Sequence, residues 1–368
     1  MKPKIGRRKF LKRAGLVGLG ALGLAGGCAK MGLGIKGPSV LPPEAQGLVS
    51  RDAASLYWPH GEPGRWFNPW WPNPGSRANL YKWKFLYRNE FAEIKNAKTP
   101  KIPVVSNDGA YLSRPQEEPS ITSIGHCGFI IQDGESVVLT DPHFGSRAFW
   151  HGRHQPPGVP AASVPAAVAA LISHNHYDHL DAWTVENLPK DVTWFVPMGL
   201  GAFVESLGRR AVELDWWRSA EHRGARLTCL PAQHWSNRFG VARDSTLWCA
   251  WLVETGGRKY FHGGDSGYFQ GFREFGRKFG AIDVAMLPIG AYEPRWMMRY
   301  SHMNPAEGLR AFHDLGARWM IPMHWGTFDL TDEPLDHPPG VLKAQVAETG
   351  ADASRVKFMA VGERWRIV

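Results

Sequence analysis

Residues 173–181 read SHNHYDHLD, which places three histidines and an aspartate within positions 174 to 179. The apolar run AAVAALI at 166–172 comes directly before this stretch. Imidazole and carboxylate groups are good metal ligands at neutral pH, and a loop at the end of a buried strand holds such groups rigidly. The stretch therefore predicts a metal site at a strand end.

Three later stretches follow the same pattern, an apolar run followed by a metal-ligand residue: LPAQHW (230–235), YFHGGD (260–265) and IPMHWG (321–326). With the first motif they supply seven candidate ligands, which are His174, His176, Asp178, His179, His234, Asp265 and His324. One tetrahedral zinc site needs fewer, whereas two cations that share a carboxylate use all seven. We expect two Zn²⁺ ions, with iron or manganese as alternatives.

The chain from about residue 120 onward alternates short apolar runs with turns and helical patterns. Helical periodicity lies near 199–207, 269–279, 304–315 and 341–349, and Thr255-Gly256-Gly257 is typical of a hairpin turn. This alternation predicts an α/β (α+β) fold of two mixed sheets packed face to face, with helices outside. Cys127, Cys229 and Cys249 lie in apolar runs without a Cys-x-x-Cys pair, so we expect buried, unpaired thiols.

The positive charge of the chain is concentrated at its N-terminus. The 368 residues carry a formal net charge of +9, and the sequence pI is about 9.4. Seven basic residues and no acidic ones fall within residues 1–27, which leaves about +2 for the remainder. The main part of the chain therefore gives no electrostatic reason to expect a nucleic-acid partner.

The N-terminal segment GRRKFLKRAGLVGLGALGLAGGC (6–28) has the pattern of an export signal. Twin arginines precede a short apolar run, and small residues precede Cys28. We expect a twin-arginine-like, lipoprotein-type signal at 1–28, with lipidation of Cys28. This would place the protein in the cell envelope, as a lipoprotein of the periplasm or outer membrane. The alternative is an apolar N-terminal anchor that is retained.

Two further segments precede the predicted main domain at 120–368. Residues 29–56 are rich in Gly, Pro and small residues and are typical of a tether. Residues 57–119 include the Trp- and Pro-rich stretch WFNPWWPNP at 66–74. We expect this segment to be an N-terminal arm that packs on the main domain, and the alternative is docking on lipid or lining a substrate channel.

The motif His-x-His-x-Asp-His, followed later by His, Asp and His, resembles the metallo-β-lactamase superfamily. That resemblance implies an αββα four-layer sandwich with metals at one edge of its sheets. The stretches SHNHYDHLD, LPAQHW, GGDSGY (263–268), LPIGAYEPRW (287–296) and HWGTF (324–328) also resemble the N-acyl-phosphatidylethanolamine-hydrolysing phospholipase D family and its bacterial relatives. This second resemblance covers roughly 57–335.

The resemblance implies a role for each candidate residue. His174, His176 and His234 would hold the first cation, Asp178, His179 and His324 the second, and Asp265 would bridge them. Tyr177 and His302 match positions that contact substrate. Asp265 stands where true β-lactamases often have Cys, which argues against antibiotic hydrolysis. Asn237 replaces a lysine that helps to bind bile acid in the relatives, so bile-acid control is not implied, whereas a homodimer is.

The chemistry that this predicts is hydrolysis of a phosphodiester in a phospholipid by a hydroxide that bridges the two cations. Asp178 or Asp265 would take the proton, and His302 would stabilise the phosphoryl oxygens or protonate the leaving group. Two alternatives stay open: a lactonase or other ester hydrolase on the same scaffold, and a non-catalytic surface protein.

Other histidines and one aspartate near these motifs are harder to assign from sequence. Asp141 and His143 end a strand that faces the same edge, so a supporting role is one interpretation. His126 and His262 are expected to be hydrogen-bonded core histidines. His302 could simply precede a helix, and Tyr177 could be a packed ring.

Overall fold

The computed structural model describes residues 50–71, 73, 77–114 and 118–367. The predicted signal with Cys28, and most of the predicted tether, lie outside these residues. The described end of the tether already forms a 3-10 helix, η2 (Ala53–Tyr57), in which Ser55 and Leu56 are buried. None of the helices in these ranges combines the length and the apolar character that crossing a bilayer requires. The domain boundaries stay predictions.

The first sheet has seven strands in the order β10-β9-β8-β5-β4-β3-β17. Their bounds are β3 (Ser120–Gly125), β4 (Gly128–Asp133), β5 (Ser136–Thr140), β8 (Ala169–Leu171), β9 (Thr193–Pro197), β10 (Arg210–Leu214) and β17 (Arg364–Arg366). The strands β5, β8, β9 and β10 pair in parallel, and the remaining pairs are antiparallel.

The second sheet has six strands in sequence order: β11 (Ser219–His222), β12 (Ala225–Leu230), β13 (Ala250–Thr255), β14 (Arg258–His262), β15 (Val284–Pro288) and β16 (Trp319–Met323). The strands β14, β15 and β16 are parallel, and β11 to β14 are antiparallel. Gly256 and Gly257 join β13 to β14 with positive φ angles of 57° and 76°, which confirms the predicted hairpin turn.

The two sheets form the inner layers of a sandwich, and both faces of the first sheet are buried. Side chains of β8 alternate between two apolar clusters, because successive residues of a strand point to opposite faces. Ala169 and Leu171 join the cluster that contains residues of both sheets, whereas Ala170 and Ile172 join the cluster formed with the helices over the other face. Both faces of this sheet are covered, as expected for parallel strands.

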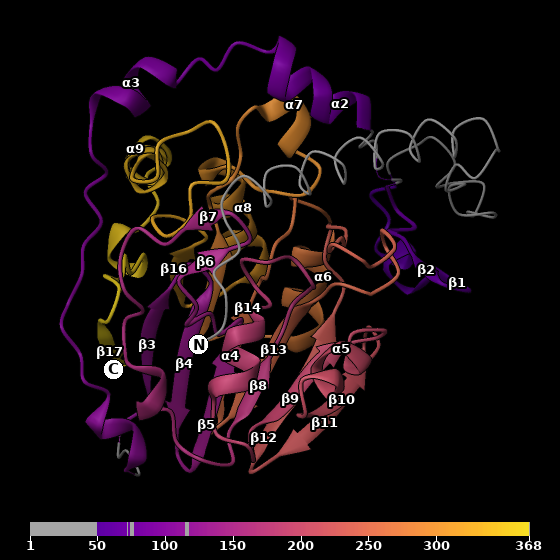
Figure 1. Cartoon of the computed structure of the whole chain (residues 1–368), viewed down its shortest axis with the longest axis vertical. Helices are drawn as coiled ribbons and strands as arrows, with labels where there is room; N and C mark the ends of the chain where they lie inside the picture. Colours follow the sequence, from indigo (N-terminus) through magenta and orange to yellow (C-terminus); the bar gives the residue numbers. More distant parts are fainter. Residues whose placement is uncertain (1–49, 72, 74–76, 115–117, 368) are drawn as a thin grey trace, which may run out of the picture. The chain divides into compact units, whose positions relative to one another are not determined.

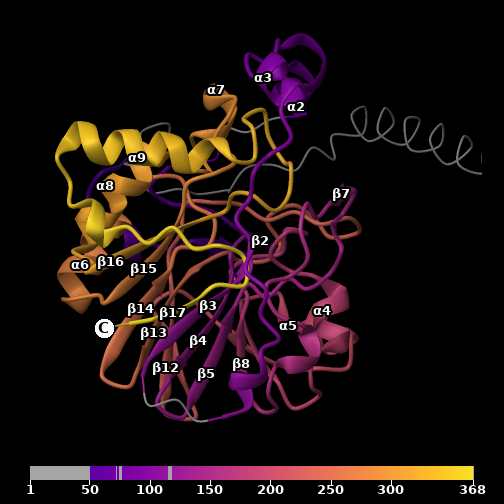
Figure 2. The same cartoon turned by 90° about the vertical axis from the view of Figure 1, so that its left-hand side faces the viewer.

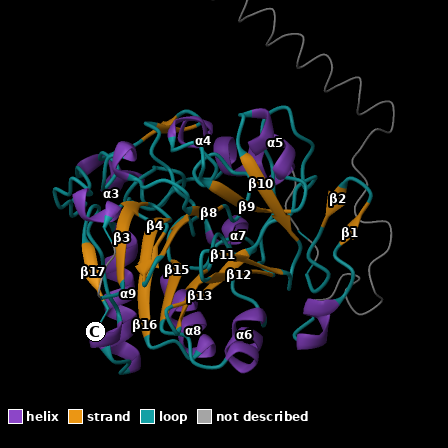
Figure 3. Cartoon of the chain, turned by 90° about the horizontal axis from the view of Figure 1, so that it is seen from below, coloured by secondary structure: helices purple, strands orange, loops and turns teal. Residues whose placement is uncertain are grey.

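Helices form the two outer layers, which confirms the predicted αββα architecture. The helices α4 (Ala182–Asn187) and α5 (Gly201–Ser206) lie on one side of the sheets, and α6 (Gly271–Phe279), α8 (Pro305–Leu315) and α9 (His337–Thr349) lie on the other (Figure 3). The start of α8 is fixed by a capping box, in which Asn304 and Glu307 exchange side-chain-to-backbone hydrogen bonds.

Several short elements surround this sandwich (Figures 1 and 2). They are β1 (Gly61–Glu62), β2 (Arg65–Trp66), α2 (Arg77–Tyr81), the π-helix η3 (Lys82–Leu86), α3 (Ala92–Ala97), η4 (Ala110–Ser113), β6 (Arg147–Ala148), β7 (His151–Gly152), η5 (Ala161–Ser163), α7 (Arg295–Met298) and η6 (Ala353–Arg355). In both views α2, α3 and α7 lie beyond the ends of the sheets at the top of the molecule.

Some of the expected elements differ from the observed ones. The apolar run 120–131 is two strands, because the chain turns at His126 and Cys127 between β3 and β4. The run 355–361 forms only isolated bridges, and the final strand, β17, follows it. The exposed or half-buried strands β10 and β11 were not expected. The three cysteines are buried and unpaired, as predicted.

The Trp- and Pro-rich stretch packs against the main sandwich where the structure describes it. Trp70 is fully buried and stacks on Phe269 at 5.1 Å. Asn68 donates to the carbonyl oxygen of His234 at 3.3 Å and to the Tyr300 hydroxyl at 2.8 Å. This segment therefore supports a loop that carries a candidate ligand.

Candidate metal centre

All four candidate motifs begin at the carboxyl ends of strands, and these ends meet at one edge of the sandwich. His174 follows β8, His234 follows β12, Asp265 follows β14 and His324 follows β16. The pairing directions bring the ends of β12, β14 and β16 to the same edge of the second sheet. The rigid sheets thus position side chains that are far apart in sequence.

The seven predicted ligand residues form two overlapping groups. His174, His176, His234 and Asp265 each offer a ligand atom, and these atoms lie within 4.8 Å of one another. Asp178, His179, Asp265 and His324 do the same. Asp265 belongs to both groups, so the arrangement is that of a binuclear metal site.

The carboxylate of Asp265 lies at the middle of this cluster, with its side chain only 1% exposed. Its Oδ2 is 3.2 Å from His179 Nε2, and 3.8 Å from Nε2 of both His174 and His234. Its Oδ1 is 3.0 Å from His324 Nε2. Four imidazoles thus direct Nε2 at one buried carboxylate.

In three of these imidazoles Nδ1, the ring nitrogen that does not face Asp265, has a partner that fixes the orientation of the ring. His174 Nδ1 lies 2.9 Å from Ser173 Oγ, and this hydroxyl donates to Asp141 Oδ2. The same Asp141 oxygen is 2.7 Å from His179 Nδ1. His234 Nδ1 is 3.0 Å from the Ser301 carbonyl oxygen. Such contacts set the tautomer in which Nε2 is free to coordinate.

His126 belongs to the site, which the sequence analysis did not anticipate. It is buried and hydrogen-bonded as expected of a core histidine, but its partner is a candidate ligand: Nε2 is 3.0 Å from Asp178 Oδ2. Its carbonyl oxygen accepts a hydrogen bond from His324 N, and its ring centroid is 4.2 Å from that of His324. His126 comes directly after β3, just as the candidate ligands follow their strands. This position could have identified it from the sequence.

Several residues at this edge adopt a left-handed backbone conformation. His126, Asp141 and His324 have φ angles of 58°, 36° and 63°, which are uncommon for residues other than glycine. Strain of this kind is concentrated at functional sites. Gly290 permits the close approach, because a Cβ there would lie 1.9 Å from the His324 carbonyl oxygen.

Burial and charge act differently on the two halves of the centre. Burial lowers the pKa of His174 and His234 well below its usual value, so both are neutral and suited to coordination. Burial opposes protonation of His324 too, but the carboxylates of Asp265 and Asp178 raise the pKa of His324 to about 9. The ligand group that contains both Asp178 and Asp265 therefore favours positive charge, which a divalent cation would supply.

The structure places His302 and Tyr177 beside the centre. His302 is fixed between the α7 segment and α8, and its Nδ1 lies 3.8 Å from Asp265 Oδ2 without a hydrogen-bond partner. Tyr177 stacks on Phe149 at 4.6 Å, and its hydroxyl accepts from Phe239 N. His302 thus faces the centre, whereas Tyr177 lies on the outer side of the ligand loop.

Arg238 holds the ligand loop from its outer side. Its buried guanidinium donates to the carbonyl oxygens of Asn175 and Leu180, at 3.1 and 2.9 Å, and lies 4.1 Å from the centre of the Tyr177 ring. These two carbonyl groups bracket the loop that carries three of the candidate ligands.

Two of the weaker candidates lie away from the ligand groups. His143 packs on Phe328, and its carbonyl oxygen accepts from Arg153. His262 is buried with Nε2 2.9 Å from the Cys127 carbonyl oxygen, as expected of a core histidine.

The donor set fits transition-metal cations. It consists of imidazole nitrogens and carboxylate oxygens, and the buried His179 Nε2 has no hydrogen-bond partner. This combination suits zinc, iron and manganese. The chemistry of the donors supports a two-cation site.

Comparisons with known proteins agree with this geometry. A family model described as a beta-lactamase superfamily domain matches residues 137–325. An uncharacterised protein of Mycobacterium tuberculosis is 38% identical, over 70% of this chain and 71% of its own length. The N-acyl-phosphatidylethanolamine-hydrolyzing phospholipase D 1 of Caenorhabditis elegans is 35% identical, over 66% of this chain and 74% of its own length.

A solved structure supports the fold alone. A metallo hydrolase from Ignicoccus hospitalis superposes with a TM-score of 0.52 at 20% identity, over 67% of this chain and 97% of that one.

Together the fold and the centre define a metal-dependent hydrolase with a binuclear His/Asp site. The chain belongs to the metallo-β-lactamase superfamily, and its homologues include phospholipases that hydrolyse N-acyl-phosphatidylethanolamine. The family resemblance found in the sequence is thereby confirmed.

Asp141→Asn is expected to weaken metal binding by about 10- to 100-fold, because it removes the charged acceptor for His179 Nδ1. Competition with a chromogenic chelator measures this affinity. The matched control is Asp133→Asn, which changes an equally buried carboxylate that binds Tyr260 and lies outside both ligand groups. Equal metal affinity in the two variants would show that Asp141 has no supporting role.

Proposed function

We propose that this protein is a phosphodiesterase of the phospholipase D type, acting on phospholipids that resemble N-acyl-phosphatidylethanolamine. The observation that carries the proposal is the pair of ligand groups that share the buried Asp265. The likeness to the Caenorhabditis elegans phospholipase supports the choice of substrate class.

In this proposal each ligand group holds one cation. His174, His176 and His234 hold the first, and Asp178, His179 and His324 hold the second. Asp265 contributes to both, which its place in the two groups supports. Zinc is the expected metal, with iron or manganese as alternatives.

Hydrolysis of a phosphodiester is slow because negative oxygens shield the phosphorus and the alkoxide is a poor leaving group. A pair of divalent cations supplies Lewis acidity and lowers the pKa of water towards 7. The carboxylate of Asp178 or Asp265 takes the proton of the attacking water. His126 holds Asp178 in place through its hydrogen bond to Oδ2.

His302 completes the polar side of the site. Its Nδ1 faces Asp265 and has no partner within the protein, so it is free to bind a phosphoryl oxygen or to protonate the departing alkoxide. Tyr177 contacts the substrate from the outer side of the ligand loop.

Exposed aromatic side chains beside Tyr177 support a lipid substrate. Phe149, Trp150 and Phe239 are 48%, 69% and 88% exposed, and Phe149 stacks directly on Tyr177. Exposed aromatic side chains that lie together favour contact with an apolar partner. A lipid that enters from an aggregate would meet these rings before it reaches the cations.

The substrate class is tested with zinc-loaded protein and three kinds of substrate. We expect turnover of bis(p-nitrophenyl) phosphate and of N-acyl-phosphatidylethanolamine in mixed micelles, and none of a panel of lactones. Turnover of lactones alone would replace the proposal with a lactonase. Absence of any turnover at full metal occupancy would indicate a non-catalytic protein.

Two alanine variants should separate metal binding from catalysis. Asp265→Ala is expected to lose measurable turnover and to retain one metal ion or fewer, because both groups lose a ligand. His302→Ala should retain two ions and lose about 100-fold or more in kcat. Metal analysis and steady-state kinetics measure both quantities, with the exposed Asp191→Ala as a control. A wild-type rate for Asp265→Ala would overturn the two-cation mechanism.

The proposed location of the protein rests on its N-terminal sequence alone. We propose that it is exported, cleaved before Cys28 and lipidated there, so that a membrane surface holds the enzyme near its substrate. A homodimer is proposed from the family resemblance. Mass spectrometry of the membrane-bound protein should find a lipidated Cys28 as the first residue. An intact N-terminus would favour a retained apolar anchor.

A further inference from the structure

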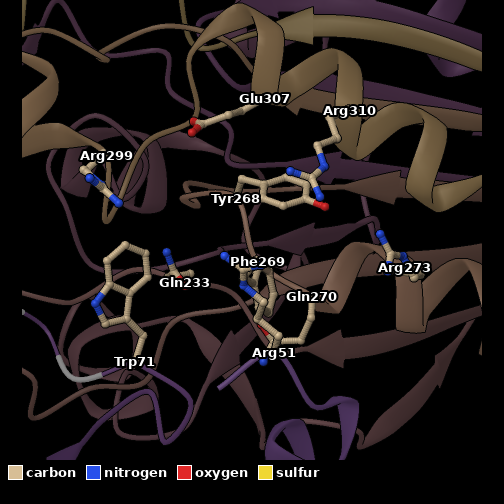
Figure 4. A pocket seen from close by; sticks show the side chains of 10 residues that line it. All are labelled: Arg51, Trp71, Gln233, Tyr268, Phe269, Gln270, Arg273, Arg299, Glu307 and Arg310. Atoms are coloured by element: carbon tan, nitrogen blue, oxygen red, sulfur yellow. The ribbon is translucent and has the colours of Figure 1, made fainter. Parts of the chain in front are cut away.

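A cavity of about 330 Å³ is lined in part by residues close in sequence to the metal-ligand candidates His234 and Asp265 (Figure 4). Its wall combines four stretches of chain: the N-terminal segment near Arg51 and Trp71, the residue before His234, the start of α6, and the α7–α8 region. The seven candidate ligands do not line it. The cavity is therefore a separate site.

The cavity has a strong excess of positive charge. Four arginines and a single carboxylate, that of Glu307, line it. The Glu307 carboxylate already accepts hydrogen bonds from the Arg295 guanidinium and from Asn304 N, and neither of these residues lines the cavity. Arg51 and Arg299 form no ion pair with any carboxylate in the part of the chain that the structure describes.

The other two arginines share one carboxylate. Arg273 Nη2 and Arg310 Nε lie 3.6 and 4.0 Å from the oxygens of Asp314, which also accepts from the Tyr268 hydroxyl. Both arginine side chains are largely exposed, at 71% and 62%. The four lining arginines thus keep a net positive charge after Glu307 and Asp314 are counted.

Aromatic rings form the rest of the wall. The Arg310 guanidinium lies 4.3 Å from the centre of the Tyr268 ring, and that of Arg299 lies 5.7 Å from the Trp71 ring. In Figure 4 the Trp71, Tyr268 and Phe269 rings lie among the arginine side chains. A ligand with an anionic group on an apolar body matches a wall of this composition.

The buried side chain of Gln233 fixes part of the wall. Its Oε1 accepts from Trp70 Nε1, and its Nε2 donates to the Tyr300 carbonyl oxygen. These contacts determine which end of the amide is nitrogen. Because its side chain is 0% exposed, Gln233 stabilises the wall and leaves contact with a ligand to the arginines and rings.

We propose that this cavity binds the phosphate monoester group of an organic phosphate. Guanidinium groups bind phosphate oxygens in pairs, and a phosphate monoester carries a charge of about −1.5 to −2 at pH 7, which suits several arginines better than a carboxylate does. Such a group occurs in soluble phosphate esters and in the headgroup of phosphatidic acid. Binding at this site does not depend on the reaction at the metal centre.

The test is calorimetric titration of the metal-loaded protein with glycerol 3-phosphate and, separately, with a short-chain phosphatidic acid below its micelle concentration. Since a phosphate can also bind the cations, wild-type protein should show two binding events. Arg51→Gln/Arg299→Gln should weaken one event at least tenfold and keep the other. Arg226→Gln/Arg366→Gln removes the same charge outside the cavity and should keep both events.

Two more variants make the result decisive. Asp265→Asn alters the metal centre and should retain the cavity event, and Arg299→Glu, a single exposed change, should abolish that event. Binding of both ligands identifies the phosphate group as sufficient, and binding of the lipid alone shows that the apolar body is also recognised. The proposal would be overturned by a single binding event that persists in Arg51→Gln/Arg299→Gln and in Arg299→Glu and disappears in Asp265→Asn.

Discussion

The structure depends on one buried carboxylate. Asp265 lies at the junction of the two ligand groups, almost inaccessible to solvent, with nitrogens of five imidazoles within 3.8 Å. A charge in that position is tolerated only when opposite charge and hydrogen bonds compensate it. The strand ends converge there, and His126 and His324 beside it have left-handed backbone conformations. Glycines at 264 and 290 allow close approach to Ser173 and to the His324 carbonyl group. The strand ends therefore meet at a point where bound cations would compensate the charge of a buried carboxylate.

The centre could be predicted from sequence because its residues obey a local rule. Each ligand comes directly after an apolar run, and runs of this kind become neighbouring strands with a common direction. His174, His234, Asp265 and His324 needed only that rule and the chemistry of their side chains. The two-sheet sandwich was predictable for the same reason, since the helical and strand periodicities are strong in the central part of the chain.

The features that could not be predicted from the sequence depend on contacts between distant residues and not on hydrophobic periodicity. His126 follows the same rule as the ligands, but it lies in an apolar run that shows no break at the turn between β3 and β4, so its bond to Asp178 was not foreseen. The edge strands β10 and β11 carry polar, partly exposed residues and lack an apolar pattern. The arginine-lined cavity combines residues from four distant stretches, and no spacing relates them.

The metal ligands are buried, whereas the aromatic residues near them are exposed. The ligands therefore define the class of chemistry, and the exposed residues bear on the choice of substrate. The ligands are held by strand ends and by the hydrogen bonds of Ser173, Asp141 and Ser301. Any phosphoryl or acyl substrate would meet the same centre. Selectivity must come from groups outside it, and under the proposed function these are the exposed rings at Phe149, Trp150 and Phe239. Phe149 and Phe239 contact the ligand loop at Tyr177, which is not one of the ligand residues. Residues of this kind can differ between proteins that share the same ligands, so one scaffold can serve many substrates.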